Sequence, residues 1–189
     1  MSTTTLDHLG PWNEVDFFAI GETTDRIELL DGSLLVSPAE GLRHQRLSMR
    51  LGIAMEGATS PAGLSIYRAM RVRLRPGRVV VPDLVVVADA DADDFDADII
   101  DHDQLVLVVE IVSAGSAGMD RLVKMQLYAA AGIGSYLLAE PESADEVSLR
   151  LFRLQGEHYV EHAAAKAGEV LSVDEPFPFV LDTAALLGR

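Results

Sequence analysis

Two nearly continuous apolar runs constrain the fold of this chain more than any other feature. Residues 79–88 read VVVPDLVVVA and residues 104–113 read QLVLVVEIVS. Strands of this composition are usually covered on both faces, because they have no polar side to turn toward water. Each run nevertheless carries one acid, Asp83 or Glu110. An unpaired buried charge costs roughly several kcal/mol, so each acid needs a partner.

Shorter patterns place further elements around these two strands. The Asp31-Gly32 pair between two β-rich runs predicts an N-terminal hairpin, and the aspartate-rich residues 89–103 are expected to form an acidic loop. Helices are predicted at residues 13–20, 41–58 and 119–132, a helical turn at 183–188, and strands at 64–75, 134–140, 147–154 and 157–162. This order indicates an α/β or α+β sheet with helices packed against it.

Length and composition limit the class of protein. With 189 residues, 49% of them apolar, the chain is expected to form a single domain over residues 1–189. It has no cysteine, which excludes disulfides and thiolate metal sites. No apolar run approaches the roughly 20 residues that span a bilayer, and the N-terminus lacks a signal-peptide pattern. We therefore expect a cytoplasmic protein that does not bind membranes.

The distribution of charge gives two opposite indications about nucleic acid. The formal net charge is −15, and eight aspartates lie between Asp89 and Asp103, which argues against nonspecific binding to phosphates. Arginines, however, gather in two places. The candidates for contact with a phosphate backbone are Arg71, Arg73 and Arg75, on one side of the predicted strand 64–75, and Arg43 and Arg46, on the polar face of the predicted helix 41–58.

Asp83 and Glu110 could meet at one end of the sheet if their strands are neighbours. Two hard oxygen ligands suit Mg²⁺, which accepts one or two carboxylates and keeps several waters, and the backbone carbonyl of Ile111 could add a ligand. The alternative is that each acid pairs with an arginine or caps a strand. Lys124, on the helix after the Glu110 strand, could assist an attacking water or stabilise charge on a phosphoryl group; the alternative is a solvated lysine.

Several short motifs follow one another in a recognisable order. They are Glu28-Leu29-Leu30-Asp31-Gly32, His44, Pro82-Asp83, Glu110 to Ser113, and then Asp120, Lys124, Tyr128 and Gly132. The series spans residues 25–140. It resembles the PD-(D/E)XK nuclease superfamily and, more closely, its Uma-type restriction endonuclease family, which is common in bacteria. In the superfamily the lysine usually stands two residues after the glutamate, where this chain has Val112; in the Uma-type pattern it lies on the following helix.

The resemblance implies a restriction-endonuclease-like fold, in which helices flank a mixed central sheet and extra β-hairpins lie near both ends. The core would span about residues 25–140, with a β-rich extension at 145–189. The resemblance also implies that Asp83 and Glu110 hold Mg²⁺ or Mn²⁺ and that Lys124 is the third catalytic residue. Glu28 could approach the metal as an extra acid or be an exposed strand residue. His44 could contact phosphate, shuttle a proton or make a structural hydrogen bond.

The resulting prediction is a metal-dependent phosphodiester hydrolase, specifically a DNA endonuclease that could act as a homodimer. Two alternatives remain at this stage. One is a nuclease-fold binding or assembly module with little or no catalysis, which the acidic charge balance favours. The other is a hydrolase of small phosphorylated substrates.

Overall fold

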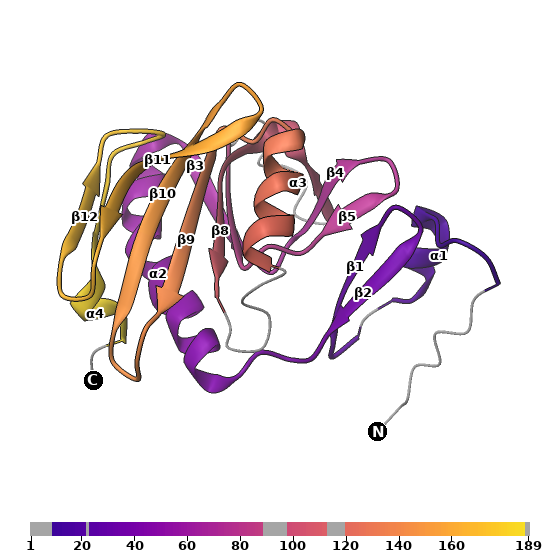
Figure 1. Cartoon of the computed structure of the whole chain (residues 1–189), viewed down its shortest axis with the longest axis horizontal. Helices are drawn as coiled ribbons and strands as arrows, with labels where there is room; N and C mark the ends of the chain where they lie inside the picture. Colours follow the sequence, from indigo (N-terminus) through magenta and orange to yellow (C-terminus); the bar gives the residue numbers. More distant parts are fainter. Residues whose placement is uncertain (1–8, 22, 89–97, 113–119, 188–189) are drawn as a thin grey trace.

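The computed structural model describes residues 9–21, 23–88, 98–112 and 120–187, which form two larger β-sheets and a small one with short helices around them (Figure 1). The helices are α1 (Glu14–Ala19), α2 (Leu42–Thr59), α3 (Met125–Ala130) and α4 (Thr183–Leu187), with helical turns η1 (Ser60–Ala62), η2 (His102–Gln104) and η3 (Asp120–Lys124). The strands are β1 (Arg26–Leu30), β2 (Ser33–Ser37), β3 (Leu64–Arg68), β4 (Arg71–Arg75), β5 (Arg78–Val80), β6 (Leu84–Ala88), β7 (Ile99–Asp101), β8 (Leu105–Ile111), β9 (Ser135–Pro141), β10 (Val147–Gln155), β11 (His158–Ala165), β12 (Val170–Val173) and β13 (Phe179–Asp182).

The central sheet is mixed and has the strand order β11-β10-β9-β8-β6-β3. Its one parallel pair is β8 with β9, and the other neighbours are antiparallel. Two consecutive parallel strands need a crossover connection, and here η3 and α3 lie in that connection. The helix that follows the Glu110 strand is thereby placed over the sheet (Figure 1).

Both faces of the central sheet are covered, which explains the unbroken apolar runs. On β6, Leu84 and Val86 pack in the same cluster as the buried stripe of α2, while Val85 and Val87 pack on the opposite side with Tyr128 of α3. The buried stripe of α2 consists of Leu47, Leu51 and Met55, as its helical periodicity predicts; Ala54, which the same periodicity assigns to the stripe, is exposed.

The second sheet has the order β2-β1-β5-β4-β7. Its β1–β2 hairpin confirms the turn predicted at Asp31-Gly32. Asp31 and Gly32 both have positive φ values, 51° and 91°, as a type I′ turn requires. β7 corrects the prediction of a loop throughout residues 89–103, because Ile100 is buried in the core shared with α3 and pairs in parallel with β4. Residues 89–97 lie outside the described part of the chain.

The segments 64–75 and 79–88, each predicted as one strand, are in fact divided between the two sheets. β3 and β6 belong to the central sheet, whereas β4 and β5 belong to the second sheet. The first break occurs at Ala69, whose φ is +50°, a value that ends an extended strand. The second break includes Pro82, which has no N–H to donate to a ladder. The amide of Ala69 donates to the carbonyl of Asp83 (3.1 Å), so both chain crossings lie side by side.

The remaining elements confirm the predicted fold class. The strands β10 and β11 form the predicted C-terminal hairpin around Gln155-Gly156, and β12 and β13 add a small sheet before α4. Mixed sheets with few helices and extra hairpins near both ends are what the resemblance implies. No helix in the described part of the chain has the length and apolar character of a membrane-spanning segment.

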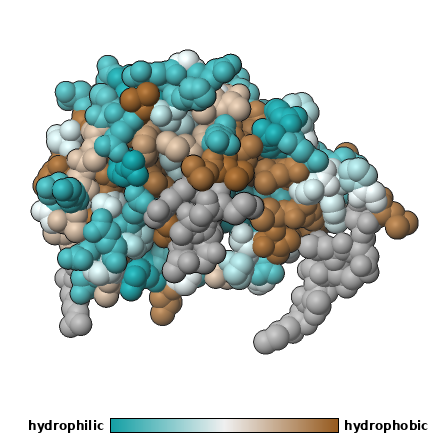
Figure 2. All heavy atoms as spheres, in the orientation of Figure 1, coloured by the Kyte–Doolittle hydropathy of each residue, from teal (hydrophilic) through white to brown (hydrophobic). Residues whose placement is uncertain are grey.

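Apolar side chains gather on the face of the molecule that carries α3 and the neighbouring β4–β5 hairpin (Figure 2). Leu122 and Val123 in η3, directly before α3, are 67% and 37% exposed. Much of the rest of this face is hydrophilic (Figure 2). The crossover that carries Lys124 is therefore bordered by apolar surface on its outer side.

Candidate active site

Asp83 lies where the chain passes from β5 of the second sheet to β6 of the central sheet. Its side chain is buried and bound on both oxygens. Arg26 of β1 forms an ion pair with Oδ1, while the ring of His44 (Nε2, 3.1 Å) and the amide of Ile111 (2.7 Å) contact Oδ2. Three segments far apart in sequence thus converge on one carboxylate.

Glu110 lies near the end of β8, the strand that pairs with β6 beside Asp83. The condition under which the two acids could meet, that their strands are neighbours, is therefore fulfilled. Glu110 faces the side of the sheet that α3 covers. The Tyr128 hydroxyl donates to its Oε1, and the ammonium of Lys124 lies 3.2 Å from the same oxygen. Lys124 and Tyr128 are four residues apart, which places them on one face of the helical segment.

Glu28 joins the same group of charges. Its Oε1 lies 3.3 Å from the ammonium of Lys124 and accepts a hydrogen bond from the amide of Val81 (2.8 Å). Since successive side chains of a strand alternate between faces, Arg26 and Glu28 point to the same side of β1. The exposed strand glutamate considered as an alternative for Glu28 is wrong, because only 1% of the residue is exposed.

The result is a buried ion cluster of three acids and three basic residues, which we call the charge cluster. The acids are Glu28, Asp83 and Glu110, and the basic residues are Arg26, His44 and Lys124. The three acids and Lys124 are between 1% and 6% exposed. The solvated lysine considered as an alternative for Lys124 is therefore also wrong.

Asp83 is held ionised by its neighbours. Burial alone would raise the pKa of its carboxyl, but the hydrogen bond with His44 and the charge of Arg26 hold that pKa well below its usual range. In turn, burial would lower the pKa of His44, and the hydrogen bond and attraction to Asp83 raise it above its usual value. His44 therefore gains a partner that favours its protonated form.

Glu110 behaves in the opposite way. Burial raises its pKa to about 7; attraction to Lys124 opposes this rise, and repulsion from Asp83 adds to it. Burial alone would lower the pKa of Lys124, but attraction to Glu110 and Glu28 raises it above its usual value, so the ammonium stays charged.

Two members of the site are not assigned a role by the sequence analysis. One is Arg26. Its spacing of two residues from Glu28 places both side chains on one face of a strand, and this could have indicated that Arg26 lies near the site. Tyr128 is the other; it was part of the ordered motif series but carried no role. Its buried hydroxyl, whose pKa burial raises well above its usual value, is a neutral donor to Glu110.

The donor set of Asp83, Glu110 and the carbonyl of Ile111 fits a hard divalent cation in type. All are oxygens, and Asp83 directly precedes β6, which pairs with the strand of Glu110. Among the described residues, no three histidine, cysteine, aspartate or glutamate side chains are grouped as a metal cluster. A donor set of two carboxylates and one carbonyl would leave several coordination positions of Mg²⁺ to water.

The arginines predicted to contact nucleic acid are placed differently on the two elements. On β4, Arg73 pairs with Glu14 (3.1 Å) and Asp101 (2.9 Å), and Arg75 pairs with Asp31. Arg71 lies against the Phe17 and Phe18 rings, 5.7 and 5.8 Å from their centroids. Arg43 and Arg46 are exposed on α2.

Comparison with known proteins shows the family of the chain. A family model named Uma2 and described as "Putative restriction endonuclease" matches residues 15–185. The chain belongs to the Uma2 family. The match covers every member of the charge cluster, as well as the C-terminal hairpins that lie beyond the ordered motifs. The family resemblance expected from those motifs is therefore confirmed.

The Uma2 chain also matches solved structures. One is the crystal structure of a protein described as "a putative nuclease belonging to DUF820" from Anabaena variabilis. The two share 16% sequence identity with a TM-score of 0.71, over 94% of this chain and 98% of the other. At this identity the match establishes a shared fold. No curated protein matches the chain.

Proposed function

We propose that the protein is a divalent-metal-dependent phosphodiesterase that cleaves nucleic acid, with DNA as the first substrate to test. One observation carries the proposal: Lys124 reaches Glu110 (3.2 Å) from the crossover helix, and Glu110 lies on the strand beside Asp83. Two acids and a lysine, brought together from separate segments in a family of restriction endonuclease type, are the residues that such a reaction needs.

Asp83, Glu110 and the carbonyl of Ile111 would hold the cation. A bound divalent ion would act as a Lewis acid on the phosphate. The amide of Ile111 already donates to Asp83 (2.7 Å), so this backbone segment and the first acid are held in register. Asp83 already carries the negative charge that attracts a cation. Glu110, in contrast, must lose a proton to bind one when the pH is about 7 or lower.

Lys124 supplies a fixed positive charge. It is buried, kept protonated by Glu110 and Glu28, and held between them at 3.2 and 3.3 Å. An ammonium held in this way needs little reorganisation to stabilise negative charge that develops on a phosphoryl group. Glu28, which is also bound to the amide of Val81, acts as a positioning residue for Lys124.

His44 is assigned a positioning role toward Asp83. Its ring lies 3.1 Å from Oδ2 and 4.0 Å from Glu40, so it is held between two acids. This arrangement fixes the direction of the Asp83 carboxylate from the α2 side. Of the three roles considered for His44, the contact with Asp83 supports this structural one.

For contacts with the nucleic-acid backbone, the geometry favours α2 over β4. Arg43 is exposed on α2, whereas Arg73 and Arg75 are already engaged with acids of the chain itself. Phosphate contacts by Arg73 and Arg75 would have to break those ion pairs. We therefore propose Arg43 as the first phosphate contact.

The test is cleavage of plasmid, linear duplex and single-stranded DNA with Mg²⁺ or Mn²⁺. Asp83→Ala, purified in parallel, serves as the blank for contaminating nuclease. Cutting above this blank, abolished by EDTA, supports the proposal. If the wild type cuts no better than the blank on any of these substrates, the nuclease proposal fails and the binding or assembly module takes its place. Light scattering at the concentrations of the assay tests for the homodimer.

A further inference from the structure

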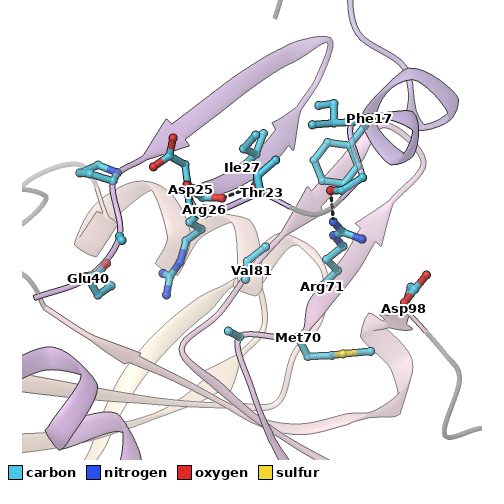
Figure 3. Close-up of a pocket in the computed structure, with 16 residues that line it drawn as sticks. Phe17, Thr23, Asp25, Arg26, Ile27, Glu40, Met70, Arg71, Val81 and Asp98 are labelled. Atoms are coloured by element: carbon cyan, nitrogen blue, oxygen red, sulfur yellow. Dashed lines mark hydrogen bonds between the residues drawn. The ribbon is translucent and has the colours of Figure 1, made fainter. Parts of the chain in front are cut away.

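A cavity of about 600 Å³ lies against the charge cluster (Figure 3). It is formed between the segment from α1 through β1, the turn before α2, and the chain crossing at residues 69–71. Its volume lies within the roughly 300–1,000 Å³ of typical small-molecule sites. Figure 3 shows Arg26 of β1 and Arg71 of β4 at separate places in its lining.

The cavity and the charge cluster are continuous through four contacts. Each one joins a residue that lines the cavity to a member of the cluster. They are Arg26 with Asp83, Glu40 with His44 (4.0 Å), the amide of Val81 with Glu28 (2.8 Å), and the amide of Ala69 with the carbonyl of Asp83 (3.1 Å). The cavity floor is therefore the near side of the proposed active site.

The burial of the reacting groups also indicates that a substrate reaches them through the cavity. Asp83, Glu110 and Lys124 are at most 6% exposed, so a phosphate on an undeformed outer surface would not reach them. The side chain of Arg26 is 15% exposed, lines the cavity and binds Asp83. Arg26 is thus the group through which a substrate phosphate in the cavity would first meet the cluster.

The walls are of two chemical kinds. The apolar part includes Phe17, Ile20, Ile27 and Met70, which suit the flat face of a base. The charged part has two guanidinium groups, Arg26 and Arg71, and three carboxylates, Asp25, Glu40 and Asp98. Although the carboxylates outnumber the guanidinium groups, each guanidinium can bind one phosphate locally with two N–H groups. A run of several phosphates would be repelled by the carboxylates.

We propose that this cavity binds one unpaired nucleotide unit, with its base between the apolar walls and its phosphate on Arg26. This inference rests on the proposed function and names its substrate class. The guanidinium has five N–H donors, so it can bind the phosphate from the cavity side while it keeps its ion pair with Asp83. The substrate is then a single strand, a strand end or a free nucleotide, not an intact duplex.

The placement of the β4 arginines agrees with this substrate class. A protein that holds a duplex needs several basic groups to neutralise phosphates. Arg73 and Arg75, the arginines of β4 nearest the β4–β5 turn, are paired with acids of the chain itself. The formal net charge of −15 also disfavours a duplex, because it repels a run of phosphates.

The experiment measures binding in EDTA, where cleavage is absent, by fluorescence anisotropy. The probe is a labelled oligothymidine DNA 12-mer, used alone and annealed to the complementary oligodeoxyadenosine strand. Thymidine monophosphate and thymidine serve as competitors. Thr24→Trp fills the cavity from an exposed loop position. Ser143→Trp, an equally small and exposed residue in the loop between β9 and β10, is the matched control.

We expect the single strand to bind at least tenfold more tightly than the duplex. Thr24→Trp should lose at least tenfold in affinity for it, while Ser143→Trp binds like the wild type. Thymidine monophosphate should compete better than thymidine, and Arg26→Lys should reduce that difference, because an ammonium lacks the two-pronged geometry of a guanidinium. Competition by the monophosphate at concentrations near those of the strand indicates a free nucleotide as ligand; competition only by unlabelled strand indicates a strand.

The inference is overturned if the duplex binds as tightly as the single strand, if Thr24→Trp behaves like Ser143→Trp, or if thymidine competes as well as its monophosphate. These results are separate from the fate of the proposed function. If the wild type and the Thr24→Trp variant cut plasmid DNA equally well, the nuclease proposal holds. The cavity then has no role in cleavage.

Discussion

Replacing Lys124 by methionine should destabilise the folded protein, and the loss should grow above about pH 7. Lys124 is the cation shared by Glu28 and Glu110, at 3.3 and 3.2 Å, and all three residues are buried. Methionine keeps an apolar side chain of similar length, so the lost free energy comes mainly from the lost charge. Removing one partner of a buried ion pair costs about 3–5 kcal/mol, and this is the loss expected near pH 6.

The pH dependence comes from Glu110. Its pKa in the folded protein is raised from an ordinary 4.5 to about 7, so the folded state binds more protons than the unfolded state between these two values. The free energy of unfolding therefore falls as pH rises through that window, by about 1.4 kcal/mol per pH unit. In the wild type the fall ends near pH 7, where Glu110 ionises beside Lys124.

Without Lys124 the pKa of Glu110 rises further, because attraction to the ammonium is what opposes the effect of burial. The fall in stability then continues above pH 7 in the variant but not in the wild type. The difference between their free energies of unfolding should be nearly constant from pH 5 to 7. Above pH 7 it should widen by up to about 1.4 kcal/mol per pH unit.

Urea denaturation followed by circular dichroism, in EDTA at half-unit steps from pH 5.5 to 8.5, measures both quantities. The matched control is Lys166→Met at the chain's other lysine, which is exposed and should stay within about 0.5 kcal/mol of the wild type throughout. If the wild-type and Lys124→Met curves run parallel up to pH 8.5, Lys124 does not set the protonation of Glu110, and the electrostatic reasoning is wrong.

Three further outcomes are expected. Calorimetry should show Mn²⁺ binding to the wild type and none to Asp83→Ala or Glu110→Ala; unchanged affinity in both variants would remove these acids from the metal site. Arg43→Glu should lower the slope of log affinity against log salt for single-stranded DNA by about one, roughly one phosphate contact, whereas Arg73→Glu should leave it unchanged; the reverse result would assign the contact to β4. Tyr128→Phe should cost about 1–3 kcal/mol of stability, since a buried acceptor loses its donor, and thermal denaturation with no measurable shift would contradict that role.

Apolar patterns predicted the local elements of the fold but not the sheet to which each strand belongs. Alternation and helical spacing depend on neighbours in the chain, so α2, the Asp31-Gly32 hairpin and the β10–β11 hairpin were predictable from local sequence. The same patterns do not state which sheet a strand joins. The break at Ala69 was missed for this reason, because alanine at a φ of +50° has no sequence signature. The break near Pro82 had a signal in the proline itself, which the continuous apolar run outweighed.

The same division applies to the site. Asp83 and Glu110 were predictable because a charge inside a doubly covered strand requires a compensating partner, and Lys124 because lysine occurs only twice in the chain. Arg26 was not predictable in this way. It lies in a half-polar strand 57 positions before Asp83. Only the pairing of β1 with β5 brings it to the place where the chain passes from β5 to β6.

The sequence by itself determined which segments are buried on both faces and that two of them carry acids, because hydrophobic burial follows residue type and spacing along the chain. The tertiary structure alone decided how those acids are compensated. The partners of Asp83 come from β1, α2 and β8, and those of Glu110 from η3 and α3. Electrostatic attraction acts over a few ångströms of space and does not depend on separation in sequence, so the charge cluster and the cavity beside it exist only once the two sheets meet.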